Sequence, residues 1–243
     1  MKIFLKSVFI AVLIISACTP SSSPTPSSSN NPIVPSTGIV TDIDGNSYIT
    51  VTIGTQIWIA ENLRTTRYCN GDSIPNLTDS LSWNSSTIGA WCWNMNVSNF
   101  ESVYGKLYNW FAVSDSRNLC PCGWHVPSDA EWSELIRFID ANSNMDTLGS
   151  LAAESYIAGG KMKAISTLWL NNDGTNETGF SALPGGSRDI NYNFTSPYWS
   201  AVFWSSSIYN ANESLTRIIL NSNNINREKS KTNNGFSIRC IKD

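Results

Sequence analysis

The chain has 243 residues, of which 41% are hydrophobic and only 14% are charged, and its formal net charge at pH 7 is −3. Charge this sparse forms no basic patch along the sequence, so nucleic acid is excluded as an expected partner. Ten tryptophans, all between Trp58 and Trp204, indicate a domain that folds through aromatic burial.

Residues 1–17 have the layout of a secretory signal peptide, with Lys2 and Lys6 followed by the apolar run 8–15 and two small residues. The tetrad that ends at Cys18 resembles the bacterial lipobox, in which the cysteine is acylated and becomes the new N-terminus. Each buried methylene contributes ~0.8 kcal/mol, so an acylated Cys18 predicts a stable membrane anchor. The alternative is an ordinary secretion signal with an incidental cysteine, which leaves the exported protein without an anchor.

The segment 18–36 combines the predicted lipidated cysteine with a stretch made almost wholly of Ser, Pro, Thr and Asn. It has too little apolar surface to offset the entropy of ordering, so we expect a disordered tether. Removal of the signal takes away two lysines and leaves 14 basic against 19 acidic side chains. The remaining residues, 37–243, are enough for one domain with a substantial core, or for two small ones.

Five cysteines follow Cys18, an odd number for an exported chain, which predicts two disulfides and one free thiol. We expect Cys69 to pair with Cys92 across a short loop, and Cys120 to pair with Cys240. Cys122 is then left over, although it could replace Cys120 in the second bond. A zinc site at Cys120 and Cys122 is disfavoured, because there is no second paired-cysteine motif and only one histidine.

The first predicted elements are strands. Ile39–Ile43 and Ser47–Ile53 flank an Asp-Gly-Asn turn, and the second run alternates apolar and polar residues, which predicts a hairpin with one buried face. Gln56–Ala60 follows as a third strand.

Helices are expected in the middle of the chain. Apolar residues spaced for one helix face run from Tyr104 to Ala112, and the helix should stop near Ser114. The next helix begins at Ser128, whose hydroxyl can cap it while Glu131 reciprocates; its apolar stripe is Trp132, Leu135, Ile136 and Ile139. A third helix is predicted over 147–157, ended by the glycines 159–160.

Strands return in the last third of the chain, at Trp199–Ser206, Leu215–Leu220 and Phe236–Ile241. The last strand places Phe236, Ile238 and Cys240 on one face. The order strands, helices, strands predicts an α+β fold in which the N- and C-terminal strands pair.

Several motifs then point to a family: VTIGTQIWIAENLRTTRYCNGDSIPN (51–76), GAWCW (89–93), YGKLYNWFAV (104–113), CPCGWHVPSDAEW (120–132), AGGKMK (158–163), GTNETGFSALPGGSRD (174–189) and GFSIRCIKD (235–243). Together they resemble the Fibrobacter succinogenes major paralogous (FISUMP) domain over residues 40–243. This domain is widespread in exported proteins and lipoproteins of Bacteroidetes, and the resemblance brings no assigned activity.

A more distant likeness concerns the fold. HVPSDAEW and GFSIRC look like segments of the formylglycine-generating (sulfatase-modifying) enzymes. This likeness implies a single C-type-lectin-like α+β domain with two to three helices, short twisted antiparallel sheets and long loops. The chemistry does not come with it, because no cysteine lies between Trp124 and Arg239. The lone His125, just before a capped helix, is expected to be structural. We therefore expect no enzyme, with a divergent enzyme of this type as a remote alternative.

Candidate binding residues lie in the polar loop 169–177, where Trp169 is followed by oxygen-bearing side chains: Asn171, Asn172, Asp173, Asn176 and Glu177. Such oxygens can coordinate calcium, and the tryptophan face can stack on a sugar. The competing interpretation is a set of turns whose side chains bond their own backbone. Arg188 is a further candidate, either for reading a ligand or for neutralising Asp189 or Asp173. No other cofactor is expected.

Together these observations predict a cell-envelope lipoprotein, anchored to the outer membrane on its periplasmic or surface face. Its domain should be a non-catalytic binding or adhesion module, with polysaccharide as the favoured ligand. The alternative is a structural envelope protein that packs against neighbouring proteins.

Overall fold

The computed structural model describes residues 37–149, 153–190, 193–195 and 197–243. All of them belong to one compact unit, Ile33–Asp243. The predicted signal peptide, the predicted lipidation site Cys18 and the predicted tether 18–36 lie outside the described residues. Within the described part of the chain, no helix has the length and apolar character needed to cross a membrane.

Both ends of this unit meet in a five-stranded antiparallel sheet. Its order is β1 (Thr37–Thr41), β2 (Ser47–Ile53), β3 (Gln56–Ile59), β12 (Ile241–Lys242) and β6 (Trp124–His125). The predicted hairpin and third strand are confirmed, with the three N-terminal strands in consecutive antiparallel pairs. The predicted single buried face of the second strand is wrong, because Tyr48 and Thr50 are buried and Ile49 is exposed. The chain's last strand inserts between β3 and β6, which confirms the predicted pairing of the terminal strands. It is shorter than the predicted strand Phe236–Ile241, whose earlier residues form only isolated bridges at Phe236 and Ser237.

A second sheet consists of three long antiparallel strands, β9 (Ser200–Asn210), β10 (Glu213–Leu220) and β11 (Ile225–Lys231). The first two confirm the expected strands and extend them. The third was not predicted, because INREKSK is mostly polar and lacks an apolar alternation. It forms because β10 offers a full edge, to which β11 bonds over seven residue pairs.

The remaining elements are short. Two-stranded ribbons are formed by β4 (Trp91–Trp93) with β5 (Lys106–Tyr108) and by β7 (Ser187–Arg188) with β8 (Phe194–Thr195). Short helical turns are α1 (Ser80–Asn84), η1 (Asn94–Asn96), η2 (Ser98–Phe100), α2 (Glu101–Tyr104), α3 (Trp110–Val113) and α5 (Ala158–Met162). The described chain is thus a mixed α+β fold with few short helices and several small antiparallel sheets.

The predicted continuous helix from Tyr104 to Ser114 is wrong. Gly105 ends α2 with φ +69°, and a Cβ at this position would lie 2.8 Å from both Cβ of Asn62 and the carbonyl oxygen of Leu63. The chain therefore turns sharply and continues as β5, whose partner β4 is 13 residues earlier in the sequence. Tertiary packing against residues 62–63 overrides the local helical spacing.

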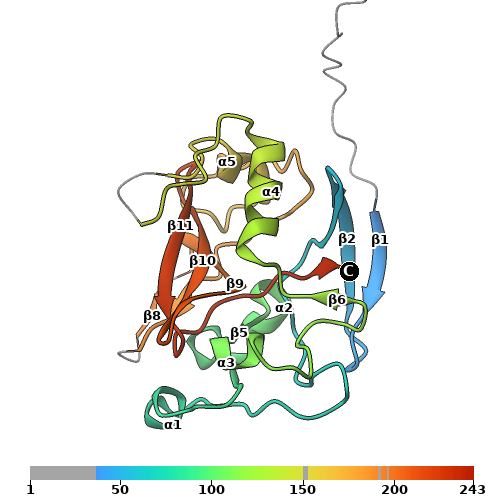
Figure 1. Cartoon of the computed structure of the whole chain (residues 1–243), viewed down its shortest axis with the longest axis vertical. Helices are drawn as coiled ribbons and strands as arrows, with labels where there is room; N and C mark the ends of the chain where they lie inside the picture. Colours follow the sequence, from blue (N-terminus) through green and yellow to red (C-terminus); the bar gives the residue numbers. More distant parts are fainter. Residues whose placement is uncertain (1–36, 150–152, 191–192, 196) are drawn as a thin grey trace, which may run out of the picture. The chain divides into compact units, whose positions relative to one another are not determined.

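The helix α4 (Asp129–Ile139) forms as predicted. Ser128 accepts a hydrogen bond from the backbone N–H of Glu131, and the Glu131 carboxylate accepts one from the backbone N–H of Ser128, which completes the capping box. All four residues of the predicted apolar stripe are buried. Figure 1 shows α4 between the two large sheets.

The core beneath α4 is aromatic. The Trp132 ring lies 4.9 Å from that of Trp58 and 5.6 Å from that of Phe203, centroid to centroid, so the helix contacts both sheets. Phe180 packs edge-on against the same rings. One continuous core spans both sheets, so the chain forms one domain rather than two small ones.

The described residues of the predicted third helix, 147–157, are not helical. Residues 150–152 of that range lie outside the described part of the chain. Leu148, an apolar residue of that predicted helix, is exposed. Glu154 donates its backbone N–H to the carbonyl of Ile225, so the chain here runs along the β11 strand instead. The helix α5 begins only at Ala158, and the two glycines expected to end a helix lie inside it. Gly159 lies against the backbone of Asn223 and Asn224, and Gly160 lies against the side chain of Asn223.

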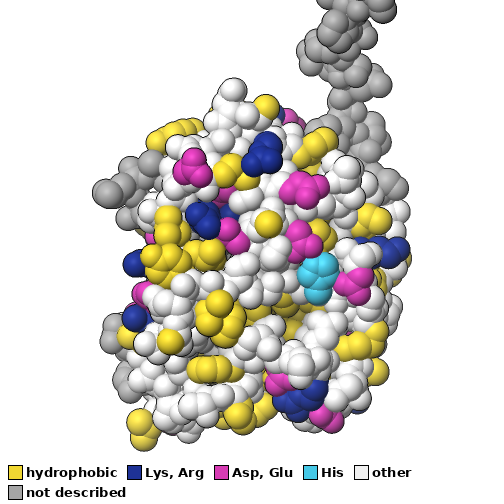
Figure 2. All heavy atoms as spheres, in the orientation of Figure 1, with side chains coloured by type: hydrophobic (Ala, Val, Ile, Leu, Met, Phe, Trp, Pro, Cys, Tyr) yellow, Lys and Arg dark blue, Asp and Glu magenta, His cyan; other side chains and the backbone are white. Residues whose placement is uncertain are grey.

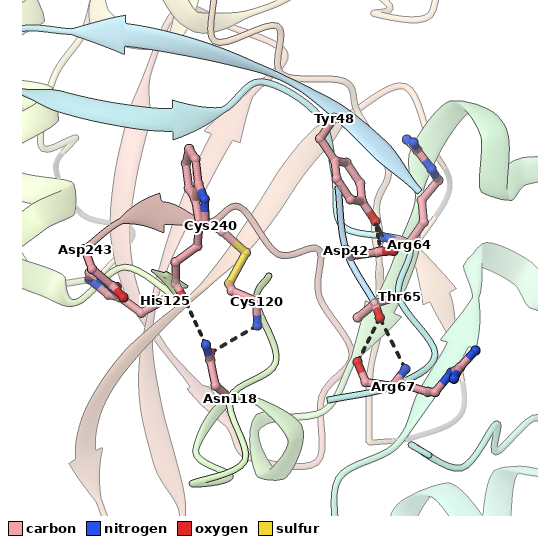
Figure 3. The surroundings of a disulfide bond; sticks show 11 residues. Asp42, Tyr48, Arg64, Thr65, Arg67, Asn118, Cys120, His125, Cys240 and Asp243 are labelled. Carbon is pink, nitrogen blue, oxygen red and sulfur yellow. Dashed lines mark hydrogen bonds and ion pairs between the residues drawn. A yellow bond between two sulfur atoms is a disulfide. The ribbon is translucent and has the colours of Figure 1, made fainter. Parts of the chain in front are cut away.

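Two disulfides fasten the fold. Cys120 bonds Cys240 as predicted, which ties the loop before β6 to the end of the chain (Figure 3). The predicted Cys69–Cys92 bond is wrong: Cys69 bonds Cys122, with Cα atoms 5.4 Å apart, and Cys92 is a free buried thiol. The reason is that Cys92 lies on β4 with its side chain in the core beside Trp83 and Leu107, whereas Cys69 donates its backbone N–H to Asn118, next to the Cys-Pro-Cys loop.

Candidate functional site

Trp169, the predicted stacking residue, cannot contact a ligand. Its side chain is 2% exposed, and its indole N–H donates to the carbonyl oxygen of Ala182 at 3.0 Å. The ammonium of Lys163 lies over the ring, 5.2 Å from its centroid. This tryptophan is therefore part of the core, and the expectation that it forms a sugar platform is corrected.

The polar residues of the same loop bond mainly to the protein. Asp173 pairs with the buried Lys163, and the Glu177 carboxylate lies 3.8 Å from Nζ of Lys161. Asn176 accepts from the backbone N–H of Ser181 and donates to its hydroxyl. Such bonds favour the turn interpretation over a calcium loop.

Two further residues of the loop, Asn171 and Asn172, are exposed, and the backbone N–H of Asn171 donates to Oδ1 of Asn221. Among the described residues, no group of three or more His, Cys, Asp and Glu side chains is placed to hold a metal ion.

Arg188 is also structural. Only 1% of the residue is exposed, and its guanidinium donates to the carbonyl oxygens of Leu77 and Thr78. The same group lies over the rings of Trp83 and Phe194. These contacts belong to a different part of the chain from the 169–177 loop, so the structure does not bring the two predicted ligand sites together.

A pocket of about 350 Å³ lies elsewhere, around Arg239 in the GFSIRC segment. Arg239 is 1% exposed. Its Nε donates to Oδ1 of Asn62 at 2.9 Å, Nη1 donates to the carbonyls of Ile59 and Phe180, and Nη2 donates to the carbonyl of Ser181 at 3.1 Å. All four acceptors are neutral, so no described carboxylate touches this buried cation.

Three segments build this pocket. The chain leaving β3 contributes residues 60–64, α2 with Gly105 forms one wall, and the loop 181–183 forms another. Gly105 is needed here, because its positive φ and close approach let α2 turn away directly above Asn62. We call this cavity the arginine pocket; in sequence, its lining residues begin with Ala60 and end with Arg239.

Arg64 and Ser102 line both the arginine pocket and a shallower, open hollow that continues over Asn46, Asn99 and Glu101. Nη1 of Arg64 donates to Glu61 at 2.8 Å and Nη2 donates to the carbonyl of Ser47 at 2.9 Å. The two hollows thus form one groove, which we call the arginine groove. Burial lowers the pKa of Arg239 to about 9, although the negative charge of Glu61 opposes this shift.

Exposed aromatic side chains lie near this groove. Tyr198 and Trp199 are 45% and 59% exposed. Tyr198 donates its backbone N–H to the carbonyl of Pro184, next to the pocket residue Leu183.

Residues 51–242 match the Fibrobacter succinogenes major domain. The chain belongs to this family. Searches of curated proteins and of solved structures found no match. Both the arginine groove residues Asn62, Arg64 and Arg239 and the two disulfides fall inside the part that matches the Fibrobacter succinogenes major domain. Two disulfides are consistent with an extracytoplasmic location for this domain.

His125 is held between two carboxylates on the surface of this domain. Nδ1 lies 2.6 Å from Oδ1 of Asp243, and Nε2 lies 2.8 Å from Oε1 of Glu131. Figure 2 shows the histidine, in cyan, with acidic side chains beside it. Burial opposes protonation, but the bonds to Asp243 and Glu131 outweigh it and raise the pKa of His125. With both ring nitrogens occupied, the residue joins α4 to the C-terminus, which fits the expected structural role.

Sequence reasoning missed Arg239, Arg64 and Asn62 as site residues. Strict alternation along the last strand assigned Phe236, Ile238 and Cys240 to the interior, which left Arg239 to face outward. The structure buries both faces, since this segment lies between the two large sheets. One usable signal was an arginine enclosed by apolar residues in an otherwise charge-poor chain.

Proposed function

We propose that this chain is a cell-envelope lipoprotein whose Fibrobacter succinogenes major domain is a non-catalytic binding module, with polysaccharide as the ligand class. The observation that carries the proposal is the arginine groove, with its fixed polar groups at Arg64 and Arg239. Exposed Tyr198 and Trp199 lie in a segment whose backbone bonds Pro184, beside the pocket residue Leu183. Concave sites of this composition bind ligands through apolar faces and a few convergent polar groups.

The groove suits a sugar better than a flat apolar ligand. Saccharides present hydroxyl groups to polar side chains and an apolar ring face to aromatic ones. Ser102 and Arg64 offer donors at the mouth, and Tyr198 and Trp199 offer ring faces. A long chain of sugars can follow the open part of the groove beyond the pocket itself.

The anchor completes the proposed role. Acylation of Cys18 would hold the protein in the outer membrane, and the tether 18–36 would let the domain reach a polymer outside the lipid surface. A C-type-lectin-like arrangement is part of the proposal. It is supported by the terminal strands that pair at β12 and β3, and by the Cys120–Cys240 bond beside them.

A structural envelope protein is the second candidate. It is favoured by the many large apolar side chains that remain exposed, among them Ile39 on the edge strand β1 and Ile208 on β9. Apolar side chains are scattered over the face in Figure 2. Apolar side chains would favour packing against neighbouring proteins where they form a contiguous patch.

A glycan array separates the two. The protein used is residues 33–243, the compact unit that holds every described element and both disulfides. We expect binding to at least one polysaccharide, weakened tenfold or more by the double change Tyr198→Ala and Trp199→Ala. Tyr209→Ala, an exposed tyrosine near the opposite end of β9, is the matched control and should bind as the unchanged protein does. Retention of envelope proteins by the immobilised domain, with no glycan bound, would overturn the binding proposal.

A further inference from the structure

The arginine groove is rich in hydrogen-bond donors that the protein does not use. A guanidinium has five N–H donors. Four described bonds from Arg239 leave one proton on Nη2, on the side where Ser181 lines the pocket. Arg64 makes two described bonds and keeps three N–H groups. The exposed Ser102 hydroxyl, at the junction of the two hollows, has no described partner in the protein either.

Within the arginine pocket, the side-chain acceptors of Glu61 and Asn62 are already occupied. Oε1 of Glu61 accepts from the backbone N–H of Ile49, and Oε2 accepts from Arg64. Oδ1 of Asn62 accepts from Arg239, while its amide nitrogen donates to the carbonyl of Tyr104. A ligand that enters the groove therefore meets spare donors and few spare acceptors.

The charge balance points the same way. The pocket contains two guanidinium groups and one carboxylate, and that carboxylate is paired with Arg64. The buried Arg239 has no counter-ion in contact, although burial of an unpaired cation is costly. An anion at the pocket would compensate a charge that the fold itself leaves uncompensated.

We propose that the arginine pocket binds a carboxylate group, so that the ligand is an acidic saccharide of the uronic acid type. The carboxylate would accept from Nη2 of Arg239, from Arg64 and from the Ser102 hydroxyl, since charge-assisted bonds to guanidinium groups are the strongest of this kind. This inference rests on the proposed glycan-binding function and specifies its ligand class.

The test compares two probes of equal length. Oligogalacturonate and its fully methyl-esterified, neutral form are titrated into residues 33–243 by calorimetry. We expect the acid to bind at least tenfold more tightly, and this preference to shrink as sodium chloride is raised, because the carboxylate contact is partly screened. Free galacturonic acid should compete, which distinguishes capture of the carboxylate from recognition of the polymer alone.

Two variants at an exposed position locate the site without disturbing the buried Arg239. Ser102→Glu introduces a carboxylate at the pocket mouth and should remove the preference for the acid. Ser102→Gln has nearly the same size without the charge and should keep most of it. Arg64→Gln should also reduce the preference, several-fold.

The outcomes separate the two proposals. Equal affinity for the acid and its ester would overturn the carboxylate inference and leave glycan binding intact. A preference for the acid that survives Ser102→Glu would place the anion elsewhere and overturn it as well. Binding of neither probe, together with an empty glycan array, would overturn the proposed function itself.

Discussion

Nε of Arg239 donates a hydrogen bond of 2.9 Å to Oδ1 of Asn62, which joins residues 177 positions apart in the chain. The same asparagine donates to the carbonyl of Tyr104 and to the hydroxyl of Ser237. One amide side chain therefore holds the end of β3, the wall formed by α2 and the C-terminal segment in register around the pocket.

Replacement of Asn62 tests this arrangement. Asn62→Ala leaves Nε of Arg239 and the Tyr104 carbonyl buried without partners, so we expect a loss of about 2 to 3 kcal/mol in the free energy of unfolding. Urea unfolding of residues 33–243 measures it. Asn99→Ala, at an exposed asparagine in the same groove, should stay within about 0.5 kcal/mol. Equal effects of the two changes would contradict the central role of Asn62.

The buried ion pair beneath α4 gives a second prediction. Nε of Arg217 lies 2.7 Å from Oε2 of Glu154, both side chains are fully buried, and Nη1 of Arg217 lies 2.7 Å from Oδ1 of Asp129. Arg217→Met should cost about 3 to 5 kcal/mol, because Glu154 is left as an uncompensated buried charge. The added change Glu154→Leu should recover much of this loss.

An exposed pair is the control for that measurement. Arg67→Met breaks the ion pair with Asp44. Because Arg67 is half-exposed, the change should lower the free energy of unfolding by less than about 1 kcal/mol. If the double variant at positions 217 and 154 is as unstable as Arg217→Met alone, the buried charge of Glu154 is not the cause of the lost stability.

His125 predicts a pH dependence of stability. Its pKa in the folded chain is raised above 6.5, so its contribution is fully present below about pH 6.5 and is lost as the pH rises through the folded pKa. Burial raises the pKa of Glu131, but hydrogen bonds from Ser128 and His125 lower it below 4.5 overall, so its contribution is lost only as the pH falls through that lower value. The His125–Glu131 pair therefore stabilises the fold most at pH values between the folded pKa of Glu131 and that of His125.

The measurement is the difference in melting temperature between the unchanged domain and His125→Gln. We expect the difference to be largest near pH 5 to 6 and to close toward about pH 8, with a free-energy effect below about 1 kcal/mol because the ring is partly exposed. Arg137→Gln on the same helix should show a difference that does not vary over this range. A His125→Gln difference that grows with rising pH would refute the ion-pair assignment.

Cys92 predicts an unreactive thiol. Burial raises its pKa to about 11, although the nearby Arg188 opposes the shift, and the thiolate is the reactive form. In residues 33–243 we expect negligible labelling by maleimide at neutral pH, and one labelled thiol per chain in denaturant without reductant. Peptide mapping should place the label on Cys92. A label on Cys122 instead would restore the pairing of Cys69 with Cys92.

Local signals predicted some elements well. The β1–β2 hairpin has a turn sequence and one alternating strand, and α4 has its cap, its reciprocal Glu131 and an apolar stripe within twelve residues. Each of these elements satisfies its own backbone hydrogen bonds, so neighbours in the sequence suffice to specify it. The Cys120–Cys240 bond was predictable in part, because the last expected strand places Cys240 on one face with Phe236 and Ile238.

Other elements depended on distant partners. The spacing from Tyr104 to Ala112 is that of a helix, yet contact of Gly105 with residues 62–63 breaks it and β4 recruits β5. The prediction of a binding site at the 169–177 loop was wrong for the same reason. The polar residues after Trp169 bond to Lys161, Lys163 and Ser181. The pocket is instead assembled from positions 60–64, 102–105, 181–183 and 239.

The sequence by itself determined the family and the capped helix, because motifs, periodicity and caps act over a few residues. The α+β class and the pairing of the chain ends followed from the order of strands and helices along the chain. Only the tertiary structure decided which cysteine pairs with Cys69, which tryptophans are exposed and where a buried guanidinium meets a pocket. These features depend on which surfaces remain after the two sheets and α4 have packed, and burial is a property of the whole fold rather than of any one segment.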